Sequence, residues 1–232
     1  MTSRLPAARC QGGFTLMEMA VVLVIIALIL GGVSVGRDVY RSAQAERLGS
    51  EFVQGWLLAY ERYVQQTARV PGDDTGATGR INGRVDDPLC DQALQDVMLR
   101  AGITLPPGRA EGLANRALYQ DANGAPQEVR LCLLHLADWS EPAPGLSRKA
   151  RPRNVLRLEG LTPELARQLD VRIDGKVDAR HGLMREKGPH ARTDTVRVGD
   201  DHPWSRHEDE TARRNNDTAA VPLLTAYIAL SR

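Results

Sequence analysis

The sequence of 232 residues is poor in cysteine and in aromatic side chains, and its charges nearly cancel. Three cysteines are too few for a small scaffold held together by disulfides. A formal net charge of +1 argues against a strongly basic nucleic-acid binder and a strongly acidic disordered chain. The hydrophobic share of 42% and the charged share of 25% are ordinary for a folded protein, and the length allows one large domain or two small ones.

Motifs that carry catalysis are also scarce. The chain has no phosphate-binding P-loop, no CxxC pair and no HExxH zinc motif. We therefore expect a protein that is not an enzyme and that needs no cofactor.

The most unusual feature is a long apolar segment near the N-terminus. Residues 14–36 contain one charge, Glu18, and residues 20–30 are apolar without interruption. A helix of this length reaches ~35 Å, enough to cross a hydrocarbon core of ~30 Å. The leader, residues 1–13, holds two arginines and no acid, which keeps it cytoplasmic. We expect a single-pass inner-membrane protein with its C-terminal region in the periplasm.

Two other interpretations of this segment are open. An ordinary secretory signal fits poorly, because the nearest small-residue cleavage site, at residues 43–45, lies beyond several charges. A signal anchor on a periplasmic enzyme or binding module explains the length and the leader charge, but it does not explain Glu18. A carboxylate costs roughly 2.5–3.5 kcal/mol at a bilayer centre. We therefore expect that Glu18 is retained for a partner.

Residues 12–18 (GGFTLME), followed by the apolar run, resemble the class III signal of type IV pilins and type II secretion pseudopilins. The resemblance implies that a prepilin peptidase cleaves between Gly13 and Phe14 and methylates the new N-terminus at Phe14. It also implies that Glu18 pairs with the N-terminal amine of a neighbouring subunit.

The same resemblance implies a set of partners and a final location, or destination, for the protein. The partners are other pilin or pseudopilin subunits and an inner-membrane assembly platform, with membrane lipid around the helix before assembly. The destination is a pilus or pseudopilus filament. Because the chain is longer than a usual major pilin, a minor pilin or pseudopilin is favoured. The system served, whether adhesion, motility, DNA uptake or secretion, is left open.

The predicted fold class is α+β and pilin-like, with a long N-terminal helix packed on a small antiparallel sheet. The helix runs to about residue 68 without a proline, residues 37–68 are its amphipathic half, and residues 69–232 form the periplasmic globular region. Its buried face is predicted from apolar side chains at three- and four-residue steps: Tyr40, Ala43, Leu48, Phe52, Trp56, Tyr60 and Tyr63.

The globular region is predicted to contain two short helices and several strands. The first helix starts at residues 87–88 and ends at Gly102, and the second starts with Thr162 as its cap. The predicted strands are 117–120 and 128–136, which form a hairpin, then 155–158 and 221–230. Residues 141–153 and 184–218 are expected to be mobile loops. The basic stretch 148–157 lacks interleaved aromatics, so we do not expect it to bind nucleic acid.

Removal of the leader would leave two cysteines, Cys90 and Cys132. In an oxidising compartment two cysteines indicate one disulfide. The alternative, two free buried thiols, stays open at this point.

Three aspartates, Asp170, Asp174 and Asp178, flank Gly175. Clustered carboxylates on a bend suit calcium, but the segment is not a DxDxDG loop and Lys176 interrupts it. We expect no metal site, and these three carboxylates are only weak candidates for one.

Overall fold

The computed structural model describes residues 15–73, 76–108, 112–144, 147–195, 199–205 and 221–231. The chain divides into two compact units, Met1–Ser42 and Ala43–Arg232, and each is described by itself.

Residues 16–67 are helical throughout. Helix α1 (Leu16–Arg47) is followed by a π-helical segment, η1 (Leu48–Val53), and by helix α2 (Gln54–Thr67). The helix ends at Ala68, whose φ of 58° is left-handed and whose N–H donates to the carbonyl of Val64. The predicted end of the helix before Pro71 is confirmed.

Among the described residues, the structure has no helix that is both long enough and apolar enough to cross a membrane. The predicted span over residues 14–36 begins outside the described residues and is not confirmed.

The predicted buried face is confirmed only from Leu48 onward. Its five later members are buried: Leu48, Phe52, Trp56, Tyr60 and Tyr63. Tyr40 is 55% exposed and Ala43 is also exposed, so the prediction was wrong for these two. Periodicity marks an apolar stripe, but burial needs a covering element, and the core of the Ala43–Arg232 unit includes this stripe only from Leu48 on.

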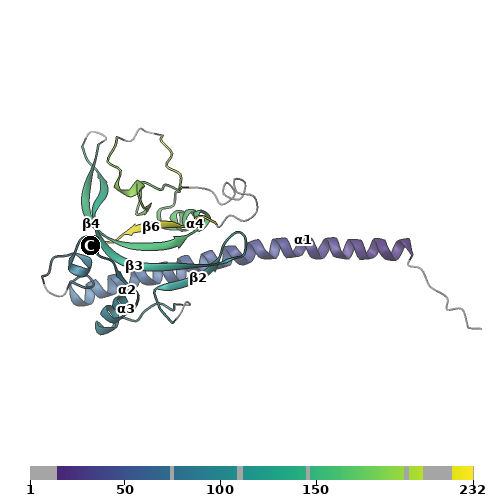
Figure 1. The fold of residues 1–232 in the computed structure, drawn as a ribbon, viewed down its shortest axis with the longest axis horizontal. Coiled ribbons are helices and arrows are strands. Elements are labelled where there is room, and N and C mark those ends of the chain that lie inside the picture. Colours follow the sequence, from purple (N-terminus) through teal and green to yellow (C-terminus); the bar gives the residue numbers. More distant parts are fainter. Residues whose placement is uncertain are drawn as a thin grey trace, which may run out of the picture. The chain divides into compact units, whose positions relative to one another are not determined.

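The sheet is antiparallel and six-stranded, with the order β1-β3-β4-β6-β5, and β2 also pairs with β3. Figure 1 labels β2, β3, β4 and β6 of this sheet. Its strands are β1 (Leu89–Cys90), β2 (Arg116–Gln120), β3 (Pro126–Pro142), β4 (Arg148–Leu161), β5 (Met184–Glu186) and β6 (Leu224–Ala229). Two further helices, α3 (Asp91–Arg100) and α4 (Pro163–Asp174), complete the larger elements, with short 3-10 turns at η2 (Ile81–Gly83) and η3 (Pro189–Ala191).

Both faces of the sheet bury apolar side chains. Alternate residues of the central strands, such as Leu133 and Leu156, join the main core, which also holds the buried side chains of α2, α3 and α4. The opposite face carries a smaller cluster: Leu134, Leu136, Trp139, Val155 and Tyr227. The α+β class and the antiparallel sheet are confirmed.

Several predicted elements have the right type. The hairpin is β2 and β3, and its turn is closed by Asp121 Oδ1, which accepts the N–H groups of Asn123 and Ala125. Thr162 caps α4 by accepting the N–H of Leu165 at 3.3 Å.

The predicted start of the first short helix is wrong. Helix α3 begins at Asp91, with Cys90 as its N-cap, because Leu89 and Cys90 are held as a strand against β3. Gly102, with φ of 72°, follows the end of this helix as predicted.

The prediction of a loop over 141–153 is wrong for residues 141–142 and 148–153. Strands β3 and β4 continue as a two-stranded ribbon in which Pro142 lies opposite Arg148. Pro152, which has no N–H to donate, lies opposite the register shift between Leu136 and Trp139, where ladder bonding is interrupted. The predicted loop 184–218 begins with strand β5, and most of its second half lies outside the described residues.

Gly160 offers a test of the packing between β3 and β4. It has φ of 82°, it lies at a register shift of β4, and a Cβ there would be 2.1 Å from the carbonyl oxygen of Glu128. We expect Gly160→Ala to lower the free energy of unfolding by about 2–4 kcal/mol in urea denaturation.

The matched control is Gly124→Ala, where φ is 80° and no atom lies within 4 Å of the added Cβ. Backbone strain alone should cost about 1–2 kcal/mol there. Equal losses at the two positions would show that the contact with Glu128 does not matter.

Candidate functional site

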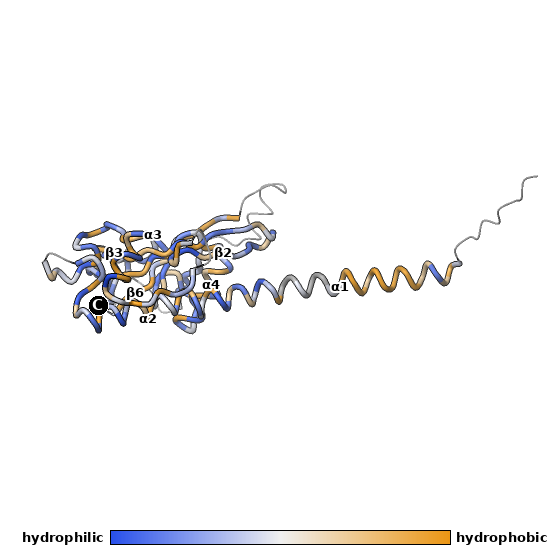
Figure 2. The backbone as a smooth tube through the Cα atoms, turned by 90° about the horizontal axis from the view of Figure 1, so that it is seen from below, coloured by the Kyte–Doolittle hydropathy of each residue, from blue (hydrophilic) through white to orange (hydrophobic). Residues whose placement is uncertain are grey.

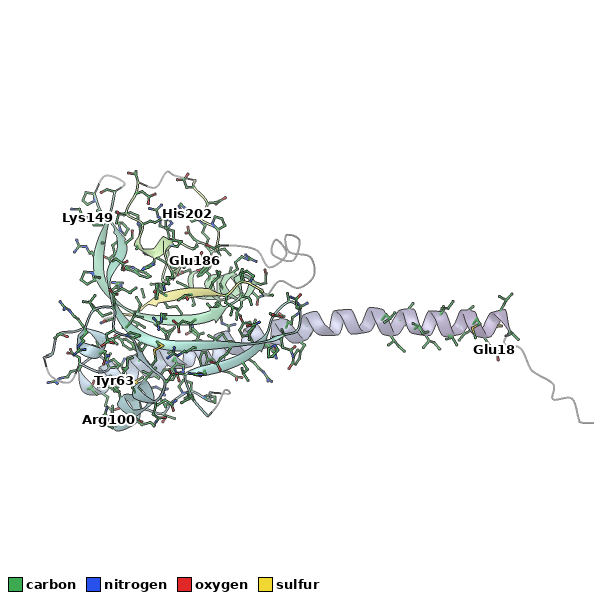
Figure 3. The ribbon with its side chains drawn as sticks, viewed as in Figure 1. Glu18, Tyr63, Arg100, Lys149, Glu186 and His202 are labelled. Carbon is green, nitrogen blue, oxygen red and sulfur yellow. A yellow bond between two sulfur atoms is a disulfide. The ribbon has the colours of Figure 1, made fainter. Side chains whose placement is uncertain are left out.

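The start of α1 is fixed by a reciprocal pair of side chains. Glu18 Oε2 accepts the N–H and the hydroxyl of Thr15, both at 2.9 Å, and Thr15 Oγ1 accepts the N–H of Glu18 at 3.2 Å (Figure 3). This is a capping box, which occupies donors that the first turn of a helix leaves free. The Thr-x-x-Glu spacing could have predicted it, and the sequence analysis missed that role. Glu18 therefore has a partner within one chain, and its pairing with a neighbouring subunit stays a prediction.

The helix after this cap is strongly apolar, and Figure 2 colours this part of α1 as hydrophobic. Its large hydrophobic side chains are all at least 44% exposed: Leu16, Met17, Met19, Val21, Val22, Leu23, Val24, Ile25, Ile26, Leu28, Ile29 and Leu30. Monomeric soluble proteins rarely expose contiguous apolar patches larger than a few hundred Å². The surface therefore indicates an apolar environment, either lipid or other helices. We call residues 16–30 the apolar segment.

The proposed cleavage site, Gly13 and Phe14, lies outside the described residues, so the structure does not test it.

The pattern GxSxG occurs once in this region, at residues 32–36. It lies inside α1, whereas a nucleophile elbow needs a sharp turn between a strand and a helix. The pattern gives no support for a hydrolase.

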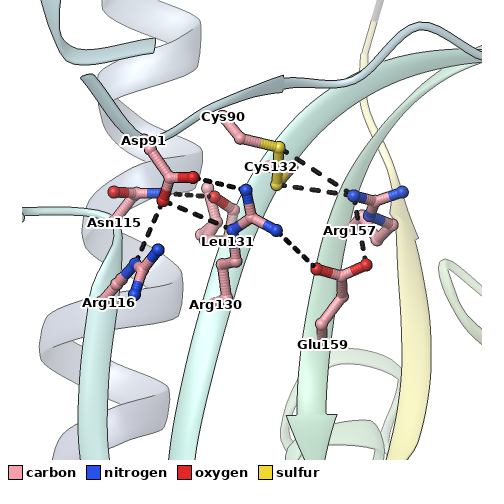
Figure 4. The surroundings of a disulfide bond; sticks show 9 residues. All are labelled: Cys90, Asp91, Asn115, Arg116, Arg130, Leu131, Cys132, Arg157 and Glu159. Carbon is pink, nitrogen blue, oxygen red and sulfur yellow. Dashed lines mark hydrogen bonds and ion pairs between the residues drawn. A yellow bond between two sulfur atoms is a disulfide. The ribbon is translucent and has the colours of Figure 1, made fainter. Parts of the chain in front are cut away.

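Cys90 and Cys132 form a disulfide, which agrees with the predicted pair (Figure 4). The two residues are opposite each other where β1 pairs with β3, and their Cα atoms are 4.6 Å apart. The Arg157 Nη2 atom lies 3.6 Å from Cys132 Sγ, and it also bonds Glu159 at 3.1 Å. Strand β1 has only two residues paired with β3, and the disulfide adds a covalent bond between these two strands.

Next to the disulfide, Asp91 ties three segments together (Figure 4). Its carboxylate accepts bonds from Arg130, from Arg116 Nε at 3.1 Å and from Asn115 Nδ2 at 3.3 Å. Burial alone would raise the pKa of Asp91, but the bonds from Arg130, Arg116 and Asn115 outweigh it and lower the pKa to about 2. The carboxylate is therefore ionised at neutral pH, and it lies in the first turn of α3, where the helix dipole favours a negative charge.

The three aspartates around Gly175 accept hydrogen bonds from the segment that follows α4. Asp170 Oδ2 accepts the N–H of Asp178 at 2.7 Å and the indole N–H of Trp204 at 2.8 Å. Asp174 accepts the N–H groups of Leu183 and Met184, both at 2.9 Å.

Asp178 does the same for its own turn, since it accepts the N–H groups of Arg180 and His181. Within the part of the chain that the structure describes, no group of three or more histidines, cysteines or acids is arranged to hold a metal. The role of Trp204 was missed, because nothing local to Asp170 in the sequence points to a residue so far along the chain.

Burial raises the pKa of Asp170 to about 7, against the lowering effect of its bonds from Trp204 and Asp178. Asp174 adds to the rise, both by its charge and by its hydrogen-bond contact. Asp170 thus favours its protonated form more than a free aspartate does.

The basic stretch 148–157 lies on β4 and is largely paired. Arg151 and Arg153 face Glu141 at 3.7 and 3.3 Å, and Arg148 donates to the hydroxyl and the carbonyl of Ser140. Four of the five basic residues, Lys149, Arg151, Arg153 and Arg157, share one face of β4 by strand alternation, and three of these four are paired with Glu141 or Glu159.

Residues 8–34 match the family model of the prokaryotic N-terminal methylation motif. The chain thus carries the N-terminal signal of type IV pilins and pseudopilins. Neither the curated proteins nor the solved structures include a match to this chain.

Proposed function

We propose that this protein is the precursor of a minor pilin or pseudopilin, a structural subunit of a type IV pilus or a type II secretion filament. The observation that supports it is the apolar segment, exposed along its whole length and lying within the methylation motif. The subunit has no enzymatic activity of its own and binds no cofactor.

In this proposal the chain passes through two states. It is first an inner-membrane protein with its N-terminus in the cytoplasm, and lipid covers the apolar segment. Prepilin peptidase then cuts between Gly13 and Phe14 and methylates Phe14. The assembly platform transfers the mature subunit into a filament, where apolar segments of other subunits replace the lipid.

Glu18 gives this assembly its axial register. In a bundle of apolar helices one helix can slide along its neighbour at little cost in free energy. An ammonium and a carboxylate attract strongly only where they meet, so the pair favours one axial position. Two unit charges ~4 Å apart at an effective dielectric of ~20 attract by about 4 kcal/mol. This is comparable with the cost of placing the carboxylate in lipid, roughly 2.5–3.5 kcal/mol.

Replacement of Glu18 by glutamine tests this step. Glutamine keeps the capping box with Thr15 and removes only the charge. We expect Glu18→Gln to leave leader cleavage intact and to lower the ratio of subunit in sheared filaments to subunit in membranes at least tenfold. The measurement is quantitative immunoblotting in a host that has the peptidase and the filament system.

The matched control is Thr15→Ala, which removes the cap and keeps the charge. It should enter filaments nearly as well as the parent. If Glu18→Gln is incorporated like the parent, the charge has no role in assembly. If the parent keeps residues 1–13 and never enters filaments, the alternative holds, a signal-anchored periplasmic enzyme or binding module.

A further inference from the structure

The Asp170 carboxyl group is fully enclosed, and one of its oxygens has no partner. Its Oδ2 atom accepts two hydrogen bonds, from Asp178 and Trp204. Its Oδ1 atom is buried without any hydrogen bond. A buried, unsatisfied carboxylate oxygen is costly, so native proteins rarely leave one in that state.

The neighbouring carboxyl group is Asp174, which stands four residues later on the same face of α4 and adds to the rise in the pKa of Asp170. Asp174 already accepts the N–H groups of Leu183 and Met184. Two ionised carboxylates cannot donate to each other, so their contact becomes a hydrogen bond only when one of them is protonated.

Charged groups from the neighbouring segments do not neutralise this pair directly. Among the described residues, no arginine, lysine or histidine is bonded to Asp170 or Asp174. Lys176 and His181 pair with Asp178 instead, and Arg185 donates to the carbonyls of Gly182 and Ser140. Other charged or titratable groups around this region include Arg148, Arg180, Asp194, His202 and Asp200, and Asp200 lines a cavity together with Asp174. The His202 ring lies 4.8 Å from that of His181.

We propose that Asp170 and Asp174 share one proton, and that this proton fastens the segment after α4 to the helix. With the proton in place, the two carboxyls hold Asp178, the start of β5 at Met184, and Trp204. Gly182 is required for the fit, since a Cβ there would lie 2.3 Å from Asp174 Oδ2. Loss of the proton places two negative charges against each other in a buried site, and this repulsion and desolvation outweigh the stronger N–H bonds that the charged Asp170 accepts.

The raised pKa of Asp170, about 7, puts this loss near neutral pH. An unfolded aspartate has a pKa near 3.8. Between this pKa and the folded pKa of about 7, the folded state binds the proton and the unfolded state has largely lost it. The stabilisation is complete below the unfolded pKa. It is lost as pH rises toward 7, by up to about tenfold in the folding equilibrium per pH unit. Burial lowers the pKa of His181 and His190, which gives the opposite trend in acid, so the test must compare variants at each pH.

The first measurement uses Asp170→Asn in the full chain, purified in mild detergent. Asparagine keeps an acceptor for Trp204 and Asp178 and offers Asp174 a permanent donor. We expect the ratio of its folding equilibrium constant to that of the parent to rise at least tenfold between pH 5 and pH 8.5, in urea denaturation. The control, Asp96→Asn at an exposed site on α3, should change neither value.

The second measurement does not depend on the variant folding. Infrared spectra of the parent should contain the carbonyl band of a protonated carboxylic acid at pH 5 that disappears by pH 9. Absence of that band at pH 5, or a pH dependence of stability that is identical in Asp170→Asn and the parent, would overturn the proposal. So would stabilisation of the parent at pH 8.5 by millimolar calcium, if Asp170→Asn abolished it, because the pair would then hold a cation and not a proton.

Discussion

Replacing Gly13 by valine should prevent removal of the leader altogether. The matched motif covers residues 8–34 and includes the junction of Gly13 and Phe14. A glycine has no Cβ and lets the backbone approach another surface closely, whereas valine is branched at Cβ and stiff. We expect intact-mass analysis of the parent to show loss of residues 1–13 and one added methyl group, and that of Gly13→Val to show neither.

The control is Gly12→Val, one residue before the proposed junction. It should be cleaved far better than Gly13→Val. That difference would show that leader cleavage depends on the position of the glycine and not on the added bulk alone. A parent protein that still begins at Met1 in a host with active peptidase would contradict the processing step. The filament test with Glu18→Gln could then not be interpreted, because no processed subunit would be present to enter filaments.

Removing the disulfide should cost the globular unit much of its stability. The bond closes a loop with a sequence separation of 42, for which chain entropy gives about 3–4 kcal/mol. The loss should be local at first, because β1 has only two paired residues and α3 follows it directly. We expect Cys90→Ser combined with Cys132→Ala to lower the free energy of unfolding by this amount in urea denaturation.

Two comparisons make that result specific. Reduction of the parent should give the same loss without any substitution, and Cys10→Ser, in the leader, should give none. Quantitative alkylation of both thiols in exported parent protein without reductant would refute the bond. Equal stability of the oxidised and the reduced parent would refute its energetic role.

The sequence by itself determined those features that depend on neighbours a few residues apart. The methylation motif, the apolar segment, the end of the long helix before Pro71 and the Thr162 cap all belong to this class. Their interactions lie within one or two helical turns, so the spacing of residue types is enough to predict them. The capping box of Thr15 and Glu18 is equally local, and it could have been predicted in the same way.

Only the tertiary structure decided the features that join distant segments. It pairs Cys90 with Cys132 across β1 and β3, it makes residues 148–153 a strand, and it brings Trp204 onto Asp170. The burial of a side chain depends on which element covers it, and no local pattern states which element that is. For the same reason the three aspartates could be found in the sequence, but their use as hydrogen-bond acceptors for a later segment could not.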